Sequence, residues 1–350
     1  MLTRLLLAAG LAVPLAGVAD DAEVPPDSLP ALGVAADRTS VVGVSSGGYM
    51  ATQLAVAWPE RFHGLGVLAA GPWGCARGKL SRALNQCMMT RRGEPSLAAL
   101  ETRRADYQSR GQVGKDANLG RLRAFVWHGE QDGVIDPVLG DLLGEQLAAW
   151  LDDEQQLKMA RDETAGHGWP VAADSADQAS ALAPCRNEGE EANLLACGED
   201  VAGAMMDWLY PERAARSEFS AGELRQFDQS DFDARGLADS GYVYVPDACT
   251  GGGCGATLAL HGCRMGAEAL GDAFARKSGL NAWADAHDEV VLYPQAESTL
   301  ANPQGCWDWW GFAESSWQLH PLHDTRDGTQ AGALLEMLDR LQGTSDAGQP

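Results

Sequence analysis

Three polar residues of this 350-residue chain are of the types that together attack acyl carbons. Ser45 lies in a Gly-x-Ser-x-Gly motif, Asp132 follows the apolar run 122–128, and His167 lies in a short loop of glycine, tryptophan and proline. A serine becomes a nucleophile when a histidine takes its proton, and an acid orients that histidine. These residues predict acyl transfer, provided that the fold brings them together.

The motif around Ser45 predicts a sharp turn between a strand and a helix. An apolar β-branched run precedes Gly43, and the helix-like segment 50–58 follows Gly47. Such a turn is so tight that only glycine fits two residues on either side of a serine held in a strained conformation. We therefore expect Ser45 to be the nucleophile and the amide of Ser46, at the helix N-terminus, to be one oxyanion donor. A bare match to this motif can also arise by chance in a glycine-rich turn.

The order of the three residues adds specificity to the motif. Ser45, Asp132 and His167 follow one another in the chain order of α/β-hydrolases. Asp136 is an alternative acid, but it precedes Pro137, where the N-terminus of a helix favours a negative charge. We therefore prefer Asp132 as the acid.

Other histidines are alternative bases. His128 lies just inside a predicted strand and is expected to be a packed residue, whereas His320 and His323 lie in a loop with Pro321. His261 precedes a glycine at the end of a strand, so we expect it to shape the turn rather than to take a proton. His167 remains the preferred base.

The elements that must position these residues occur in an unusual order. Apolar runs predict buried parallel strands, and the run 256–263 ends in His261-Gly262. In an ordinary α/β-hydrolase the loop that supplies the other oxyanion amide precedes the nucleophile, but here it follows Ser45 by about two hundred residues. A helix over 327–341 would lead directly into the strand before Ser45 in an unpermuted chain. The sequence therefore predicts a circularly permuted α/β-hydrolase fold, with a mostly parallel sheet flanked by helices, as a single domain over 20–345. The strands are expected at 41–44, 64–71, 122–128, 242–246, 256–263 and 289–294.

Charge and the N-terminal segment limit the partners and the compartment. The formal net charge is -23, which would repel nucleic acids and anionic membranes, so we expect neither as a partner. Residues 1–19 combine a basic start, a short apolar stretch and small residues, which is typical of a secretory signal. We expect a secreted or periplasmic monomer.

Eight cysteines in an exported chain predict disulfides. A zinc site is the alternative, but no Cys-x-x-Cys pair and no His pair at ligand spacing accompanies them. We expect no metal and no cofactor. Many pairings are possible in principle, and local spacing favours four of them: Cys75 with Cys87, Cys185 with Cys197, Cys249 with Cys254, and Cys263 with Cys306.

Four stretches resemble the secreted poly(3-hydroxybutyrate) depolymerases whose catalytic domain is circularly permuted. They are 43–50 (GVSSGGYM), 71–77 (GPWGCAR), 260–263 (LHGC) and 302–311 (NPQGCWDWWG). The last stretch is the most specific, because hydrolases in general do not require tryptophans after Gly-Cys. The resemblance covers nearly the whole mature chain and implies hydrolysis of polyester or oligoester by a serine esterase.

The resemblance also implies roles for individual residues. Ser45 is the implied nucleophile, Asp132 the orienting acid and His167 the general base, with oxyanion amides on Ser46 and Cys263. Among the tryptophans of the last stretch, which line the ester-binding crevice or belong to the core, Trp307 is expected to bind substrate. Many family members carry a separate polymer-adsorbing domain after the catalytic part. We expect none here, and therefore faster attack on soluble oligomers or amorphous granules than on crystalline polymer.

Two other functions are compatible with the same residues. A feruloyl or acetylxylan esterase, or a β-diketone hydrolase of the polyvinyl-alcohol type, can share the fold and the triad, because specificity lies in the pocket. A non-catalytic polymer-binding module is the third hypothesis, and the intact Ser45, Asp132 and His167 argue against it.

Overall fold

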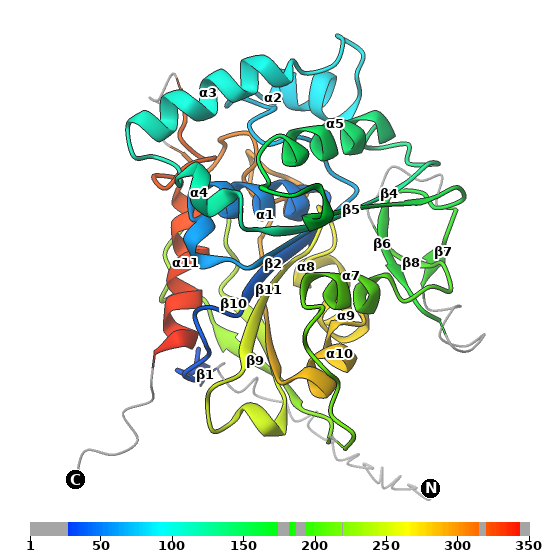
Figure 1. Ribbon diagram of the computed structural model, residues 1–350, viewed down its shortest axis with the longest axis vertical. Helices are drawn as coiled ribbons and strands as arrows, with labels where there is room; N and C mark the ends of the chain where they lie inside the picture. The colour runs from blue at the N-terminus through cyan, green and yellow to red at the C-terminus, as the bar shows by residue number, and fades with distance from the viewer. Residues whose placement is uncertain (1–26, 174–181, 187–192, 219, 315–319, 344–350) are drawn as a thin grey trace, which may run out of the picture.

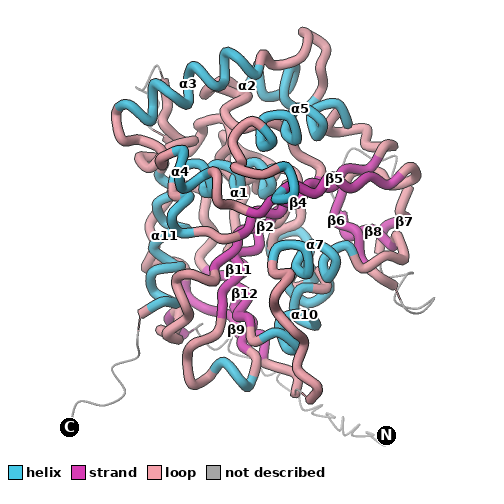
Figure 2. The backbone as a smooth tube through the Cα atoms, in the orientation of Figure 1, coloured by secondary structure: helices cyan, strands magenta, loops and turns pink. Residues whose placement is uncertain are grey.

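A computed structural model describes residues 27–173, 182–186, 193–218, 220–314 and 320–343. The predicted signal segment 1–19 lies outside the described residues. At the centre is a nine-stranded sheet with helices on both faces (Figures 1 and 2). No helix among the described residues is long and apolar enough to cross a membrane.

The central sheet is parallel except for one strand. β10 runs antiparallel to both of its neighbours, and all other neighbouring pairs are parallel. In spatial order the strands are β1 (Asp27–Ser28), β9 (Glu223–Asp228), β10 (Ser240–Val245), β12 (Glu289–Tyr293), β11 (Gly255–Leu260), β2 (Thr39–Val44), β3 (Gly64–Leu68), β4 (Arg123–Gly129) and β5 (Leu157–Asp162).

The sheet separates two buried cores, because successive side chains of a strand point to opposite faces. Val41 belongs to one core and Val42 to the other, and Val126 and Trp127 divide in the same way. The first core is covered by α1 (Ser46–Ala57), α3 (Leu97–Ser109), α4 (Asp116–Leu119), α5 (Pro137–Ala148) and α11 (Thr329–Gln342). The second is covered by α7 (Val201–Leu209), α9 (Ala273–Lys277) and α10 (Leu280–His287).

Apart from the edge strand β1, each half of the chain contributes a continuous block of strands to the sheet, and the two blocks meet between β11 and β2. β11, from the second half, lies beside β2, which carries the nucleophile motif. The start and the end of the described chain also meet. The Leu32 amide donates to the Leu341 carbonyl at 3.1 Å, and the Gly33 amide donates to Gly343 at 2.8 Å. The chain therefore has an α/β-hydrolase-like fold whose ends lie beside the nucleophile strand, and this confirms the predicted fold class.

A small second sheet and four disulfides complete the described structure. β6 (Gly168–Val171), β8 (Asn193–Ala196) and β7 (Ala183–Pro184) form that sheet. The disulfides join Cys75 to Cys87, Cys185 to Cys197, Cys249 to Cys254 and Cys263 to Cys306, which is the pairing that spacing favoured.

Two predicted strands are shorter than expected, because 64–71 is a strand only as far as Leu68 and 256–263 only as far as Leu260. Residues 267–287 form three short helices, α8 (Ala267–Leu270), α9 and α10, which are separated where Gly271 and Gly279 adopt positive φ angles of 57° and 87°. The described residues that precede β2 are also packed, since β1 pairs with β9 and Leu29 is buried. The remaining short helices are α2 (Leu80–Arg82), η1 (Pro59–Arg61), η2 (Ala83–Met88), η3 (Glu154–Gln156) and η4 (Asp247–Cys249).

Candidate active site

Ser45 stands at the turn between β2 and α1 in a strained backbone conformation. Its φ is 56°, a region that side chains other than glycine rarely adopt. A Cβ atom at Gly43 would lie 2.3 Å from the Gly47 carbonyl oxygen, and one at Gly47 would lie 2.2 Å from the Leu260 oxygen. Both glycines are therefore required by close backbone contacts, as the motif predicts.

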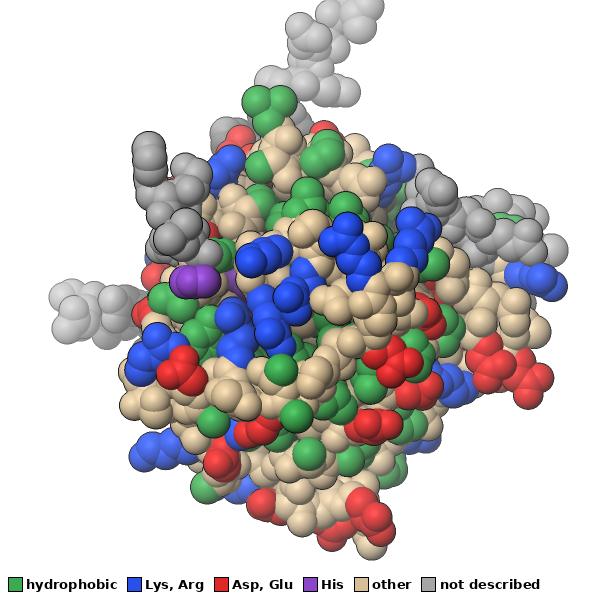
Figure 3. Space-filling view, turned by 90° about the horizontal axis from the view of Figure 1, so that it is seen from above, with side chains coloured by type: hydrophobic (Ala, Val, Ile, Leu, Met, Phe, Trp, Pro, Cys, Tyr) green, Lys and Arg blue, Asp and Glu red, His purple; other side chains and the backbone are tan. Residues whose placement is uncertain are grey.

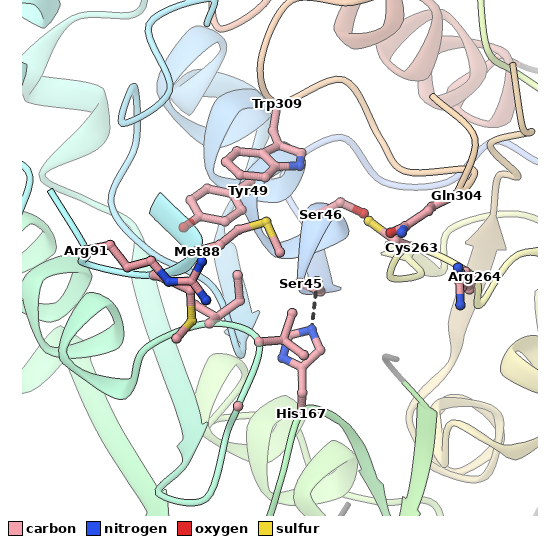
Figure 4. Close-up of a pocket in the computed structure, with 14 residues that line it drawn as sticks. Ser45, Ser46, Tyr49, Met88, Arg91, His167, Cys263, Arg264, Gln304 and Trp309 are labelled. Carbon is pink, nitrogen blue, oxygen red and sulfur yellow. Dashed lines mark hydrogen bonds between the residues drawn. The ribbon is translucent and has the colours of Figure 1, made fainter. Parts of the chain in front are cut away.

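The three sequence-predicted polar residues lie together in one hydrogen-bonded chain. His167 Nε2 lies 2.9 Å from Ser45 Oγ, and His167 Nδ1 lies 2.7 Å from Asp132 Oδ2 (Figure 4 shows the first of these bonds). Asp132 follows β4, and His167 directly precedes β6. All three residues are buried, which excludes most water from the bonds between them.

The Asp132 carboxylate accepts four hydrogen bonds. Oδ1 accepts the amides of Val134 and Ile135 at 2.8 and 2.9 Å, while Oδ2 contacts His167 and, at 3.1 Å, Nε2 of His128. Burial alone would raise the pKa of Asp132, but the two histidines lower it well below its usual range. Asp132 is therefore charged, and the His167 Nδ1 atom beside it carries a proton.

His128, which the sequence predicts to be a packed residue, is also a second partner of the Asp132 carboxylate. It is fully buried, and its Nε2 atom lies 3.1 Å from both Asp132 Oδ2 and the Ile135 carbonyl oxygen. Both neighbours are acceptors, so Nε2 carries the proton and donates it. The sequence feature that could have indicated this contact is the spacing of four residues between His128, at the end of a strand, and Asp132, just after it.

A cavity of about 230 Å³ opens above Ser45 and His167. Figure 4 places Tyr49 and Met88, together with Arg91, to one side of Ser45, and Ser46, Cys263, Arg264 and Gln304 to the other; the lining also includes Met89, Val134, Ile135 and Trp309. The first group is mostly apolar and the second is polar. Such a cavity can hold an apolar ester beside the nucleophile.

Ser46 and Cys263, the two predicted oxyanion residues, both line this cavity. Among the described residues, no turn or loop hydrogen bond uses either amide as its donor. Cys263 belongs to a turn that follows β11, and this turn is held by bonds from the Arg264 amide to the Gln304 oxygen at 2.8 Å and from Met265 to Gly262 at 3.1 Å. Two amides from opposite halves of the chain are thus available at the polar side of the cavity.

The structure does not place Trp307 in the lining of the cavity. Its side chain is fully buried, and its indole Nε1 donates to the His261 carbonyl oxygen at 3.0 Å. Trp309 lines the cavity instead and stacks on Tyr49 with a ring separation of 4.4 Å. Of these two tryptophans, Trp309 is therefore the one placed to meet a ligand in the cavity.

Polar groups hold the tryptophan loop against the site. Asp308 is buried and accepts the amides of Gly311, Phe312 and Ala313, while Asn302 exchanges two hydrogen bonds with the backbone of Cys306. The Cys263–Cys306 disulfide joins this loop to the oxyanion turn. Burial, only partly offset by these amides, raises the pKa of Asp308.

The alternative residues have other contacts. Asp136 caps α5 by accepting the Val138 amide, His323 is buried with its Nε2 atom 3.1 Å from the Trp309 oxygen, and His320 is exposed. Among the described residues, the one cluster with metal-ligand spacing consists of Asp162 and two cysteines that are bonded to each other as a disulfide. Neither cysteine can act as a thiolate ligand there.

His261 shapes the turn, as the sequence predicts. It is fully buried, the Ala296 amide donates to its Nε2 atom at 3.1 Å, and its Nδ1 lies 2.7 Å from the Gly262 oxygen. Burial lowers the pKa of His261 to about 4. The ring is therefore neutral at pH 7 and joins the end of β11 to the loop that follows β12.

Comparison with known proteins gives close relatives over most of the chain. The chain is 34% identical to a polyhydroxybutyrate depolymerase of Talaromyces funiculosus, over 91% of this chain and 94% of that protein. It is 33% identical to a poly(3-hydroxybutyrate) depolymerase of Delftia acidovorans, over 95% of this chain but only 65% of that protein. No protein-family model matches the chain.

Solved structures give a similar result. A PHB depolymerase complexed with an R3HB trimer superimposes with a TM-score of 0.80 at 30% identity, and covers 91% of this chain and 100% of that one. The crystal structure of PHB depolymerase from Penicillium funiculosum gives a TM-score of 0.79 at 31% identity with the same coverage.

Proposed function

Because this chain belongs to the polyhydroxybutyrate depolymerase family, we propose that it hydrolyses the ester bonds of poly(3-hydroxybutyrate) and its oligomers. The observation that carries the proposal is the chain of hydrogen bonds from Ser45 through His167 to Asp132 at the floor of the cavity. The apolar side of the cavity suits the methyl-branched, uncharged backbone of such a polyester.

The proposed mechanism is acyl transfer. His167 Nε2 takes the proton of Ser45, and Ser45 Oγ attacks the ester carbonyl carbon. Asp132 accepts the hydrogen bond from the Nδ1–H group of His167 and stabilises the imidazolium that forms. His167 then gives the proton to the leaving alkoxide, which departs as an alcohol.

The amides of Ser46 and Cys263 are proposed to bind the developing oxyanion. Removal of one such donor in other serine hydrolases costs about 3 to 4 kcal/mol of transition-state stabilisation. Water, activated by His167, then cleaves the acyl-enzyme and releases a hydroxyacid. In this proposal Trp309 and Tyr49 contact the ester chain, in the place expected for Trp307.

We also propose that the protein acts outside the cytoplasm as a monomer. Four disulfides support an oxidising compartment, since such bonds persist in the periplasm and outside the cell. Detection of the protein, with residues 1–19 removed, in the culture medium or in a periplasmic fraction tests this part.

A substrate panel tests the proposed function. The purified protein is incubated with hydroxybutyrate trimers, amorphous granules, feruloylated sugar esters and a β-diketone polymer, and products are followed by mass spectrometry. We expect 3-hydroxybutyrate and its short oligomers from the first two, and no turnover by the Ser45→Ala variant. If the hydroxybutyrate substrates stay intact while another ester or the diketone is cleaved, the depolymerase assignment is wrong.

A further inference from the structure

One segment of this acidic chain carries only positive charges. Residues 77–92, which we call the cationic segment, contain five Lys or Arg and no Asp or Glu, in a protein with 26 basic and 49 acidic residues. Its charged members are Arg77, Lys79, Arg82, Arg91 and Arg92. The view of this face in Figure 3 shows Lys and Arg side chains gathered together.

The cationic segment is fixed to the elements that carry the nucleophile. It includes α2 and η2, and the Cys75–Cys87 disulfide closes most of it into a loop. The Tyr49 hydroxyl, from α1, donates to the Cys87 carbonyl oxygen. The Asp136 amide, at the start of α5, donates to the Met88 oxygen at 2.7 Å. The loop is therefore held in place over the cavity.

None of the five cations is neutralised within the described part of the chain. No ion pair or hydrogen bond there involves the side chain of any of them. Arg103, on the neighbouring helix α3, is different because it forms an ion pair with Asp324 at 2.9 Å. Burial, together with the charges of Arg82 and Arg103, lowers the pKa of Arg77, in keeping with its place among like charges.

One end of the cationic segment enters the cavity. Met88, Met89 and Arg91 line the same cavity as Ser45 and His167, and Arg91 lies across Ser45 from Cys263 and Gln304 (Figure 4). Arg91 is exposed, so its guanidinium is accessible to a ligand in solution. A planar guanidinium suits a carboxylate because it can donate two parallel hydrogen bonds.

The products of ester hydrolysis supply such a carboxylate. Each cleavage consumes one water and leaves a carboxylic acid on one fragment and a hydroxyl on the other, so every oligomer is an anion at neutral pH. In an oligomer the terminal unit that carries the free carboxylate is joined to the rest through its hydroxyl oxygen. Cleavage of that last ester bond therefore releases this unit as the alcohol product. The overall charge of the protein would repel this anion, but a local group of unpaired cations attracts it.

We propose that Arg91 binds the terminal carboxylate of hydroxyalkanoate oligomers and that the rest of the cationic segment draws them to the cavity. This inference rests on the proposed function and adds a preference for anionic substrates. In this arrangement the carboxylate end of the bound oligomer lies toward Arg91. The alcohol fragment, which is the first product to leave, carries that carboxylate. A neutral polyester would gain nothing from these charges.

The test compares a 3-hydroxybutyrate trimer as the free acid with its methyl ester. For each protein the kcat/KM on the free acid is divided by that on the methyl ester. We expect Arg91→Gln to lower this ratio roughly 3- to 10-fold, the range for a partly exposed charge-assisted contact. Raising the ionic strength should lower the ratio of the wild-type protein and change that of the variant much less.

Arg340→Gln is the matched control, because Arg340 is an exposed arginine on α11 whose loss changes the net charge equally. It should leave the ratio as in the wild type. An unchanged ratio in Arg91→Gln, or an equal fall in the control, overturns the inference alone. A wild-type protein that cleaves neither form of the trimer overturns the proposed function and the inference with it.

Discussion

Asp132 contacts two histidines, and only one of them reaches Ser45. The contact between His167 and Asp132 belongs to the proposed proton relay, whereas the Nε2–H of His128 restrains the same carboxylate oxygen from the other side. Without His128, Oδ2 would lose one donor, and the carboxylate would be freer to rotate about its side chain. His128 is therefore expected to act as a positioning residue.

The prediction at this scale is that His128→Leu lowers kcat for p-nitrophenyl butyrate about tenfold, equivalent to about 1.4 kcal/mol. The pKa of Asp132 should also rise, because the carboxylate loses a contact that favours its charged form. His128→Gln, which keeps a donor, should recover part of the rate. His63→Gln is the control, since His63 bonds the Leu209 oxygen away from the site. A folded His128→Leu protein with full kcat would contradict this role.

The sequence predicts the chemistry of individual residues better than the direction of their side chains. Ser45, Asp132 and His167 could be selected because each lies next to the end of an apolar strand or in a loop of breakers. Trp307 and Trp309 could not be distinguished, because a loop without periodicity gives no rule for which side chain faces the cavity. In the structure Trp309 lines the cavity, whereas Trp307 is fully buried and donates to the His261 oxygen.

At the scale of elements, the site depends on how closely α1 approaches the turn after β11. A Cβ at Gly47 would lie 2.2 Å from the Leu260 oxygen and 2.5 Å from the His261 oxygen, and neither backbone atom can move without displacing the oxyanion turn. The Gly-x-Ser-x-Gly motif is therefore a contact between the two halves of the permuted chain as well as a local turn. Its strand, turn and helix were predictable, but the contact with β11 was not visible in the motif.

We predict that Gly47→Ala lowers the free energy of unfolding by more than about 2 kcal/mol, as expected of overpacking against backbone. It should also reduce ester hydrolysis in the fraction that folds. Gly332→Ala is the matched control, because Gly332 is also in a helix and a Cβ there meets nothing within 4 Å. That control should be stabilised by up to about 1 kcal/mol. Urea unfolding of both variants checks the contrast, and equal stability of the two would contradict it.

At the scale of the whole molecule, the permutation was predictable from the late position of the His261-Gly262 turn. The order of strands in the sheet and the break of 267–287 into three helices required the structure, because long-range pairing and positive-φ glycines leave weak local signals. The buried His261 joins three segments of the second half of the chain, since it contacts Gly262, Ala296 and the indole of Trp307. The protonation of this ring therefore affects the stability of the whole fold.

The last prediction concerns acid. Burial lowers the pKa of His261 to about 4 from 6.5, so between these values the unfolded chain takes up a proton that the folded chain refuses. The contribution of His261 to stability is complete above about pH 6.5 and falls by about 3 kcal/mol as the pH drops to 4. Burial raises the pKa of Glu289 to about 7, so the contribution of Glu289 to stability increases as the pH drops, opposite to that of His261.

The contribution of His261 is isolated by comparing the wild-type protein with His261→Gln, because the Glu289 effect is common to both. The free energy of unfolding in urea, with disulfides intact, is measured for each protein from neutral pH down to about pH 4. The advantage of the wild type over the variant should shrink steadily across this range, since only the wild-type unfolded state gains a proton at position 261. An advantage that stays constant, or that grows toward acid, would mean that the ring is already charged or exposed in the folded protein.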